Sequence, residues 1–373
     1  MTERFDVIIV GGGVIGSSIA FQLSKRNYKV LIVEKDKLAG RASSAAAGML
    51  GAQSELENNS PLFEVARQSR AMFPALADEL KELTGIDIEL MQNGILKVAM
   101  TNEECTHIKS ISAFQQAVGE KAEWLSSEQV KEKEPSISDS VLGGMFMPND
   151  GQVSAPKLSI AFAQAATVLG AQIFEYTEVC NFLIEKGHVI GVETVNGKLY
   201  ADETIVAGGA WSTQIMKHTG MKLDVYPVKG ECFSVRFKGR LLKSSIFSSM
   251  GYIVPKAGGR LIIGATQKPY TFDEAVHLGS VSHLVNNAKK IISSLKDAEW
   301  DKVWAGIRPQ TEDGMPYLDK HPHVNGLSIA TGHYRNGILL SAYTGLHMAD
   351  LLEGKEVNTN FCLDRKTIKG VHA

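Results

Sequence analysis

The first forty residues carry the clearest pattern of hydrophobic and polar positions. Residues 7–10 are apolar without interruption, three glycines follow, and apolar residues then recur at helical spacing at Ile19, Ala20 and Leu23. A second apolar run covers residues 29–33. Because an uninterrupted apolar run of this length is typical of a strand buried on both faces, the pattern predicts a strand, a tight turn, a helix and a second strand.

Helical periodicity also predicts a long amphipathic helix over residues 61–83, which Gly85 would end. Residues 86–90 alternate between apolar and polar positions and therefore predict a strand. The Asn-Gly pair at 93–94 predicts a hairpin turn from that strand into another over residues 95–99.

The chain as a whole divides into segments with two different patterns of predicted secondary structure. Strands alternate with helices in residues 1–85, 150–220 and 305–373, whereas residues 86–149 and 221–304 are rich in strands. We therefore expect an α/β fold, α+β overall, in which the first three segments form a Rossmann-like domain and the other two form an inserted antiparallel-sheet substrate domain. The elements expected after residue 150 are helices at 156–169, 276–295 and 338–352 and strands at 172–174, 182–184, 199–206, 225–235, 252–254, 261–263, 300–307 and 327–331. The ligand cleft would lie between the two domains.

The glycines of the first turn have the spacing G-x-G-x-x-G, at Gly11, Gly13 and Gly16. In this motif Gly11 permits the sharp turn, Gly13 lets a pyrophosphate approach the backbone, and Gly16 lets the helix pack closely on the strand. The helix N-terminus would face the phosphates, and Glu34 would accept hydrogen bonds from the adenosine ribose. A carboxylate there disfavours a 2′-phosphate, so the motif predicts FAD or NAD, without choosing between them, rather than NADP.

Two further glycine-bearing segments are expected beside the cofactor. Residues 40–50, which include Arg41, are small and polar, and they follow the ribose acid by one short loop. Residues 207–209, which include Gly208, come directly after a predicted strand. Ligands of open α/β sheets bind at the carboxyl ends of the strands, so both segments are candidates for cofactor contact.

Composition narrows the class of protein. The 373 residues are 44% apolar and 21% charged with a net charge of −2, which is typical of a globular protein of two domains. No long basic run is present, so nucleic acid is not an expected partner, and no uninterrupted apolar stretch reaches the length of a membrane span. The four cysteines are far apart and without metal-site spacing, so we expect reduced thiols, no metal and a cytoplasmic location: Cys105, Cys180, Cys232 and Cys362.

Six short motifs follow one another along the chain: GGGVIG at 11–16, SSAAAGMLGA at 43–52, PVKGE at 227–231, YIVP at 252–255, GIRP at 306–309 and GHYRNGI at 332–338. Together they resemble the D-amino-acid oxidase and sarcosine oxidase family of flavoproteins, and most of all its bacterial members that oxidise glycine and are linked to thiamine biosynthesis. The resemblance implies FAD as cofactor, dioxygen as electron acceptor and a homotetramer. Some sarcosine oxidases bind flavin through a cysteine, but no cysteine lies in the last two motifs, so we expect noncovalent FAD.

The same resemblance implies which residues contact FAD. Beyond the glycines, Glu34, Arg41 and Gly208 named above, they are Val14, Ile15, Lys35, Ala42, Ser43, Ala47, Gly48, Met49, Val179, His333, Tyr334, Arg335, Asn336, Gly337, Ile338 and Leu339. The last seven precede or begin a predicted helix, whose N–H groups could stabilise negative charge on a reduced flavin.

The substrate residues combine a physical argument with the resemblance. An amino-acid carboxylate is best held by a bidentate guanidinium, and we expect Arg308 to follow a strand into the cleft. By resemblance, Tyr252 donates to the same carboxylate and Arg335 is a second arginine near substrate and flavin, so these three are the expected catalytic residues. Met250 replaces a histidine found in some relatives. Together with Gln267 and Gly51 it is expected to shape the substrate site.

The implied reaction is hydride transfer from the α-carbon to flavin, reduction of dioxygen to hydrogen peroxide, and hydrolysis of the imine to glyoxylate and ammonia. Expected substrates are glycine, sarcosine, small D-amino acids and other N-substituted glycines. Two alternatives stay open: a sarcosine or D-amino-acid oxidase or dehydrogenase of the same family, and a noncatalytic dinucleotide-binding module. The residues leave open the ranking of substrates, the acceptor in the cell and the fate of the imine.

Overall fold

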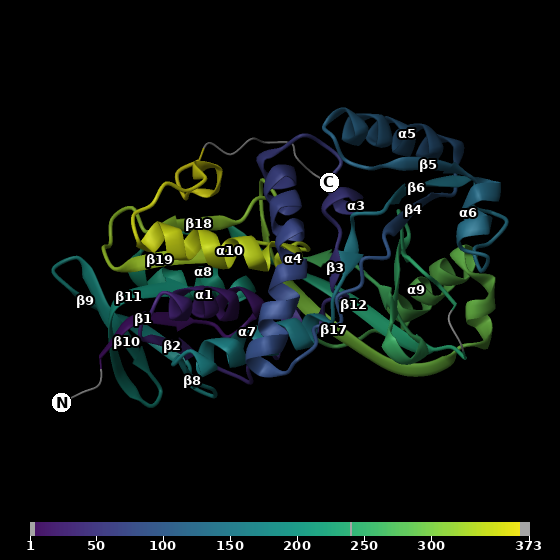
Figure 1. Cartoon of the computed structure of the whole chain (residues 1–373). Helices are drawn as coiled ribbons and strands as arrows, with labels where there is room; N and C mark the ends of the chain where they lie inside the picture. The colour runs from purple at the N-terminus through teal and green to yellow at the C-terminus, as the bar shows by residue number, and fades with distance from the viewer. Residues whose placement is uncertain (1–3, 239–240, 366–373) are drawn as a thin grey trace.

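The computed structural model describes residues 4–238 and 241–365, in which two large sheets lie side by side (Figure 1). The first sheet has a parallel centre, in which β1 pairs with both β2 and β11, and antiparallel strands at one edge and in an extension. Its order is β18 (Tyr317–Lys320), β19 (Leu327–Thr331), β11 (Gly197–Val206), β1 (Arg4–Val10), β2 (Val30–Val33) and β8 (Gln172–Phe174), with β10 (His188–Thr194) and β9 (Val179–Glu185) extending from β11. The predicted succession of strand, turn, helix and strand at the N-terminus is confirmed.

Helices cover one face of this sheet and bury its apolar side chains. They are α1 (Val14–Lys25), α4 (Pro61–Thr84), α7 (Ala155–Val168) and α10 (Gly337–Leu352). The long helix α4 was predicted, and Gly85 ends it at φ 73°, a conformation that favours glycine. Within the described ranges, no helix has both the length and the apolar character that crossing a membrane requires.

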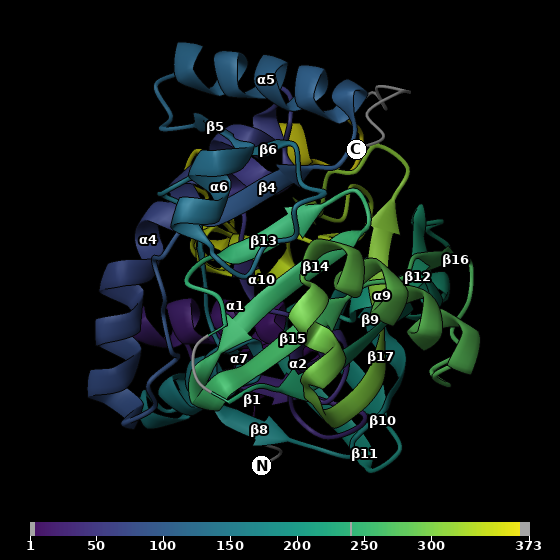
Figure 2. The ribbon, with the colours of Figure 1, turned by 90° about the vertical axis from the view of Figure 1, so that its right-hand side faces the viewer.

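The second sheet is mostly antiparallel. Its order is β16 (Lys268–Pro269), β12 (Val225–Arg236), β15 (Arg260–Gly264), β14 (Gly251–Lys256), β13 (Ser245–Ser248), β4 (Ile95–Ala99), β6 (Gly143–Met147) and β5 (Glu123–Ser126), and β17 (Glu299–Thr311) pairs with β12. Figure 2 shows α9 (Leu278–Ile291) lying over β14 and β15, with α5 (Asn102–Ala117) and α6 (Ser127–Lys133) near β4, β5 and β6. The assignment of residue ranges to two domains stays a prediction.

Short elements connect the two sheets. They are α2 (Ala42–Ala45), β3 (Met49–Leu50), α3 (Ala52–Glu55), β7 (Gly151–Gln152) and α8 (Ser212–Met216). Strand β3 pairs with β7, and α2 lies against β17. Chain segments from both halves of the sequence therefore meet at the junction of the sheets.

The strand predicted over residues 86–90 and its hairpin are wrong. Glu89 adopts φ 56°, which interrupts an extended strand, and the Ile88 carbonyl accepts a hydrogen bond from Ser154 N, 2.8 Å away. Strand β4 pairs with β6 and β13, which are distant in sequence, and not with residues 86–90. The alternation arises because Ile88 is buried, 1% exposed, in the core of the first sheet while its polar neighbours face outward.

Candidate active site

A deep pocket lies between the two sheets. It is lined by the carboxyl ends of β1, β2, β11 and β19 on one side and by β12, β14 and β17 on the other. Most of the predicted site residues line it: Gly11, Gly13, Val14, Ile15, Glu34, Lys35, Arg41, Ala42, Ser43, Ala47, Gly48, Met49, Val179, Gly208, Tyr252, Arg308, His333, Tyr334, Arg335, Gly337 and Ile338. Segments from the two ends of the sequence, between Gly11 and Ile338, thus share one cavity.

Two glycines of the G-x-G-x-x-G motif are required by packing. A Cβ at Gly11, which has φ 116°, would lie 2.5 Å from the Ala207 carbonyl oxygen, and a Cβ at Gly16 would lie 2.0 Å from the Gly11 oxygen. No side chain fits at either position, so the turn and the helix start depend on these glycines. Gly16 itself does not appear among the described lining residues.

Gly13 differs from them because its open side faces the pocket. The nearest described neighbour of a Cβ placed there is the Ser43 hydroxyl oxygen, 3.2 Å away. Gly13 is also the N-cap of α1 and has no side chain to cap it, and the Val14 N–H donates to Ser43 Oγ at 2.9 Å. A helix N-terminus beside an open cavity fits a phosphate group.

The Glu34 carboxylate is held in place by the backbone. It accepts hydrogen bonds from Gly12 N, 2.7 Å away, and from Asp36 N, 2.9 Å away. It lines the pocket at the end of β2, where a dinucleotide would place its ribose. Each carboxylate oxygen keeps a lone pair for a ligand hydroxyl.

Arg308 lies within β17. The sequence had suggested that it follows the end of a strand, and this expectation is wrong. Its guanidinium lies against Gly230 on the neighbouring strand β12: a Cβ at Gly230 would lie 2.2 Å from Nη2. Its Nη1 donates to the Thr266 carbonyl oxygen at 3.3 Å. No carboxylate of the described chain lies within 4 Å of Arg308, so its positive charge is available to an anionic ligand.

Tyr252 on β14 presents a phenol to the same part of the pocket. Its hydroxyl lies 3.3 Å from the thiol of Cys232 on β12, which also lines the pocket. Burial raises the pKa of Tyr252 well above its ordinary value, and Arg308 and Arg335 oppose this only partly. The phenol is therefore protonated and able to donate a hydrogen bond.

Arg335 carries a charge that is already compensated. Its Nε lies 2.9 Å from Oε2 of Glu55, which lines the pocket at the end of α3 and is largely buried. Burial acts to lower the pKa of Arg335, but Glu55 together with Tyr334 and Tyr252 outweighs it, so the pKa is raised. Arg335 and Arg308 thus differ, since Arg335 is ion-paired and Arg308 has no such partner among the described residues.

The loop before α10 provides another wall. His333 is buried, and its Nε2 lies 3.0 Å from the Thr344 hydroxyl; burial lowers its pKa to about 3, so the ring is neutral. The Tyr334 hydroxyl donates to Gln267 Oε1 at 2.9 Å. This hydrogen bond connects the loop to the segment of the second sheet that also supplies the Thr266 carbonyl.

Besides Gly16, five predicted residues are not among the described residues that line the pocket: Gly51, Met250, Gln267, Asn336 and Leu339. Met250 packs against the apolar cluster under α9, and Leu339 is in the core of the first sheet. Asn336 is the N-cap of α10, and Gly51 precedes α3. The roles expected of Gly51, Met250 and Gln267 in the substrate site, and of Asn336 and Leu339 in FAD contact, stay predictions.

Sequence reasoning missed several pocket residues, of which Glu55, Gly230, Cys232 and Trp211 are the most informative. The indole of Trp211 lies 4.4 Å from the Lys35 ammonium, measured to the ring centroid. Gly230 stood inside the motif at 227–231 without an assigned role, and Glu55 follows the motif at 43–52 by three residues. The two motifs indicated this region of the chain, but not the residues that Gly230 and Glu55 contact.

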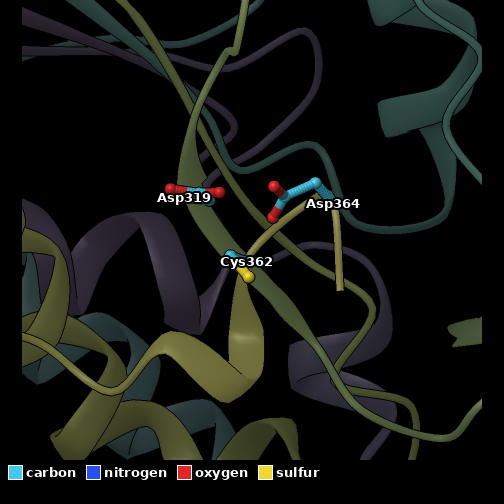
Figure 3. A group of neighbouring side chains, drawn as sticks. All are labelled: Asp319, Cys362 and Asp364. Carbon is cyan, nitrogen blue, oxygen red and sulfur yellow. The ribbon is translucent and has the colours of Figure 1, made fainter. Parts of the chain in front are cut away.

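Three possible metal ligands lie away from the pocket: Asp319, Cys362 and Asp364 (Figure 3). Asp319 already accepts hydrogen bonds from Leu363 N, 2.9 Å from Oδ2, and from Lys320 N, 2.8 Å from Oδ1. Burial raises the pKa of the Cys362 thiol, which disfavours the thiolate that a metal requires. The Asp319 carboxylate is thus accounted for by its contacts to the chain.

Comparison with known proteins matches residues 6–351 to the family described as FAD dependent oxidoreductase. The chain is 50% identical to the glycine oxidase of Geobacillus kaustophilus (strain HTA426), over 95% of each chain. It is 33% identical to the bifunctional protein ThiO/ThiG of Trichormus variabilis, over 93% of this chain and 52% of that protein. The crystal structure of glycine oxidase from Geobacillus kaustophilus superposes with a TM-score of 0.95 at 48% identity, covering 98% of this chain and 100% of the other.

Proposed function

Because the chain belongs to the FAD-dependent oxidoreductase family, we propose that it oxidises glycine and small related amino acids at the α-carbon, with dioxygen as acceptor. The observation that carries the proposal is the unpaired guanidinium of Arg308, which shares one pocket with a dinucleotide cradle. A small amino acid offers one strong handle, its carboxylate, and a guanidinium is the matching partner.

The residues present fit FAD, the cofactor of this family. Gly13 leaves room for a pyrophosphate, the N-terminus of α1 faces it, and Glu34 is placed for the ribose. When bound, FAD supplies the two-electron acceptor for the reaction. We propose that the cofactor is noncovalent, because the one pocket cysteine among the described residues, Cys232, is hydrogen-bonded to Tyr252 and burial raises the pKa of its thiol.

Arg308 binds the substrate carboxylate, and the Tyr252 hydroxyl donates a hydrogen bond to it. The two contacts orient the α-carbon, while the walls of the pocket exclude water. The substrate amine must be neutral when its α-hydrogen leaves as hydride, so the pH dependence of the rate is expected to follow deprotonation of the amine. Overall, glycine, dioxygen and water give glyoxylate, ammonia and hydrogen peroxide.

We further propose that the chain acts as a cytoplasmic homotetramer and supplies the thiazole branch of thiamine biosynthesis. The similarity to one half of a bifunctional ThiO/ThiG protein supports this role, because it places such a domain in one chain with a second activity. Sarcosine, small D-amino acids and other N-substituted glycines are secondary substrates in this proposal. Analytical ultracentrifugation of the flavin-loaded protein tests the oligomeric state.

The activity is tested with a peroxide assay across glycine, sarcosine, D-alanine and D-proline. Anaerobic bleaching of the flavin absorbance by the same compounds is recorded in parallel. Peroxide formation with glycine supports the proposal. Bleaching without peroxide in air identifies a dehydrogenase, and no bleaching with any of the four compounds refutes amine oxidation. Arg308→Ala should retain flavin and lose most activity, whereas near-normal efficiency would place the carboxylate elsewhere.

A further inference from the structure

Arg308 and Arg335, two of the three arginines that line the pocket, are not equivalent in charge. Arg335 is ion-paired with Glu55 at 2.9 Å, whereas Arg308 donates only to a carbonyl oxygen and has no carboxylate within 4 Å in the described ranges. Both line the pocket together with Tyr252, and their positive charges act to lower its pKa. Of the three arginines that line the pocket, Arg308 is therefore the one without a carboxylate partner among the described residues, since Arg41 pairs with Asp36 and Glu274.

Glu55 is fixed in position by a buried network beneath it. The Asp150 carboxylate, which is fully buried, accepts hydrogen bonds from the backbone N–H groups of Gln53 and Ser54, the two residues before Glu55. Arg70 donates to the same carboxylate at 2.6 Å. Helix α3 thus cannot easily move Glu55 away from Arg335, because the movement would break buried charged hydrogen bonds.

We propose that Glu55 is a specificity-determining residue that restricts the pocket to substrates with a single anionic group. This inference rests on the proposed function, in which Arg308 binds that group. A second carboxylate, carried by a substituent on the substrate nitrogen, is unfavourable in either of two arrangements. Beside the Glu55 carboxylate it is repelled. If it pairs with Arg335 in place of Glu55, the largely buried Glu55 carboxylate is left unpaired. N-methylglycine encounters neither penalty.

The test compares two ligands that bind without reacting. Methoxyacetate and oxydiacetate are the oxygen analogues of N-methylglycine and iminodiacetate, and they lack the amine that oxidation requires. Their dissociation constants are measured by titrating the visible spectrum of flavin-loaded protein. Glu55→Gln removes the charge and keeps the shape. In this variant oxydiacetate should bind at least about tenfold more tightly relative to methoxyacetate than in the wild type, because Arg335 becomes available.

The control variant is Glu57→Gln, which makes the same charge change two residues away. Glu57 pairs with Lys97 and is absent from the described pocket lining, so the ratio of the two constants should stay at its wild-type value. In the double variant Glu55→Gln/Arg335→Gln the gain should disappear, since no cation is released. The same dissociation constants are measured for Glu55→Met, which also removes the charge, so that the proposal can still be tested if Glu55→Gln folds poorly.

An unchanged ratio in both Glu55 variants, with methoxyacetate binding retained, overturns the proposal. An equal rise in Glu57→Gln also overturns it, because the effect would then be a general one of net charge. The peroxide assay with glycine distinguishes a failure of this proposal from a failure of the proposed function. If the wild type fails to oxidise glycine but the binding ratios change as expected, the charge selection stands and the proposed reaction falls.

Discussion

Gly230→Ala is the substitution that separates the chemistry of the pocket from the stability of the fold. An added Cβ would lie 2.2 to 2.4 Å from three atoms of the Arg308 guanidinium, where real contacts of a Cβ are at least 3.0 Å. The guanidinium is the free end of a long side chain, so it moves and the strand does not. We therefore expect the free energy of unfolding to change by less than about 1 kcal/mol.

The same shift should nearly abolish turnover. The carboxylate anchor would be displaced, and a misplacement of about 1 Å costs on the order of 100-fold in rate. Steady-state peroxide production with glycine, at matched flavin content, measures the loss. The double variant Gly230→Ala/Arg308→Ala should be no worse than Arg308→Ala alone, because both changes remove the same contact.

Gly279→Ala on α9 is the matched control, since a Cβ there meets nothing within 4 Å in the described structure. It should leave both activity and flavin binding unchanged. If Gly230→Ala keeps more than about a third of the wild-type efficiency, against the ~100-fold loss expected, Arg308 does not work from its observed position.

Three further outcomes follow from individual groups. Glu34→Ala should weaken FAD binding by roughly 1–3 kcal/mol, measured by flavin titration of apoprotein, because a charged acceptor is lost. The pKa of His333 is lowered by burial to about 3, so wild-type stability should fall as the pH drops from 6.5 toward 3, and urea unfolding should show a shallower fall in His333→Gln. Burial, and then Arg260, lower the pKa of Lys256 to about 7, so the stability of the wild type relative to Lys256→Met should rise between pH 7 and 10.5. The same change in unfolding free energy between pH 7.5 and 9.5 in the wild type and in Lys256→Met would contradict this.

Short-range patterns predicted what depends on neighbouring residues. The turn at Gly11 and the end of α4 at Gly85 each need residues within a few positions of one another. The segment 86–90 failed for the complementary reason. Its alternation resembles a strand, but the hydrogen bond of Ile88 goes to Ser154, a partner that no local pattern identifies. Helix α5 was missed although Thr101 and Glu104 form a capping box before it.

The candidate site likewise has features that the sequence could predict and features that depend on residues distant in the sequence. Arg308 could be identified because a guanidinium beside a strand is chemically distinctive, but the absence of a carboxylate partner for it among the described residues could not. That lack of a partner depends on Glu55 pairing with Arg335, 280 residues later, and on the absence of a side chain at Gly230. Charge balance in a pocket is a sum over all its walls, so a sequence motif names the charged residues and leaves their net effect undetermined. For this chain that sum decides which arginine can take the substrate, and it makes Glu55 and Gly230 as important to the proposed reaction as Arg308 itself.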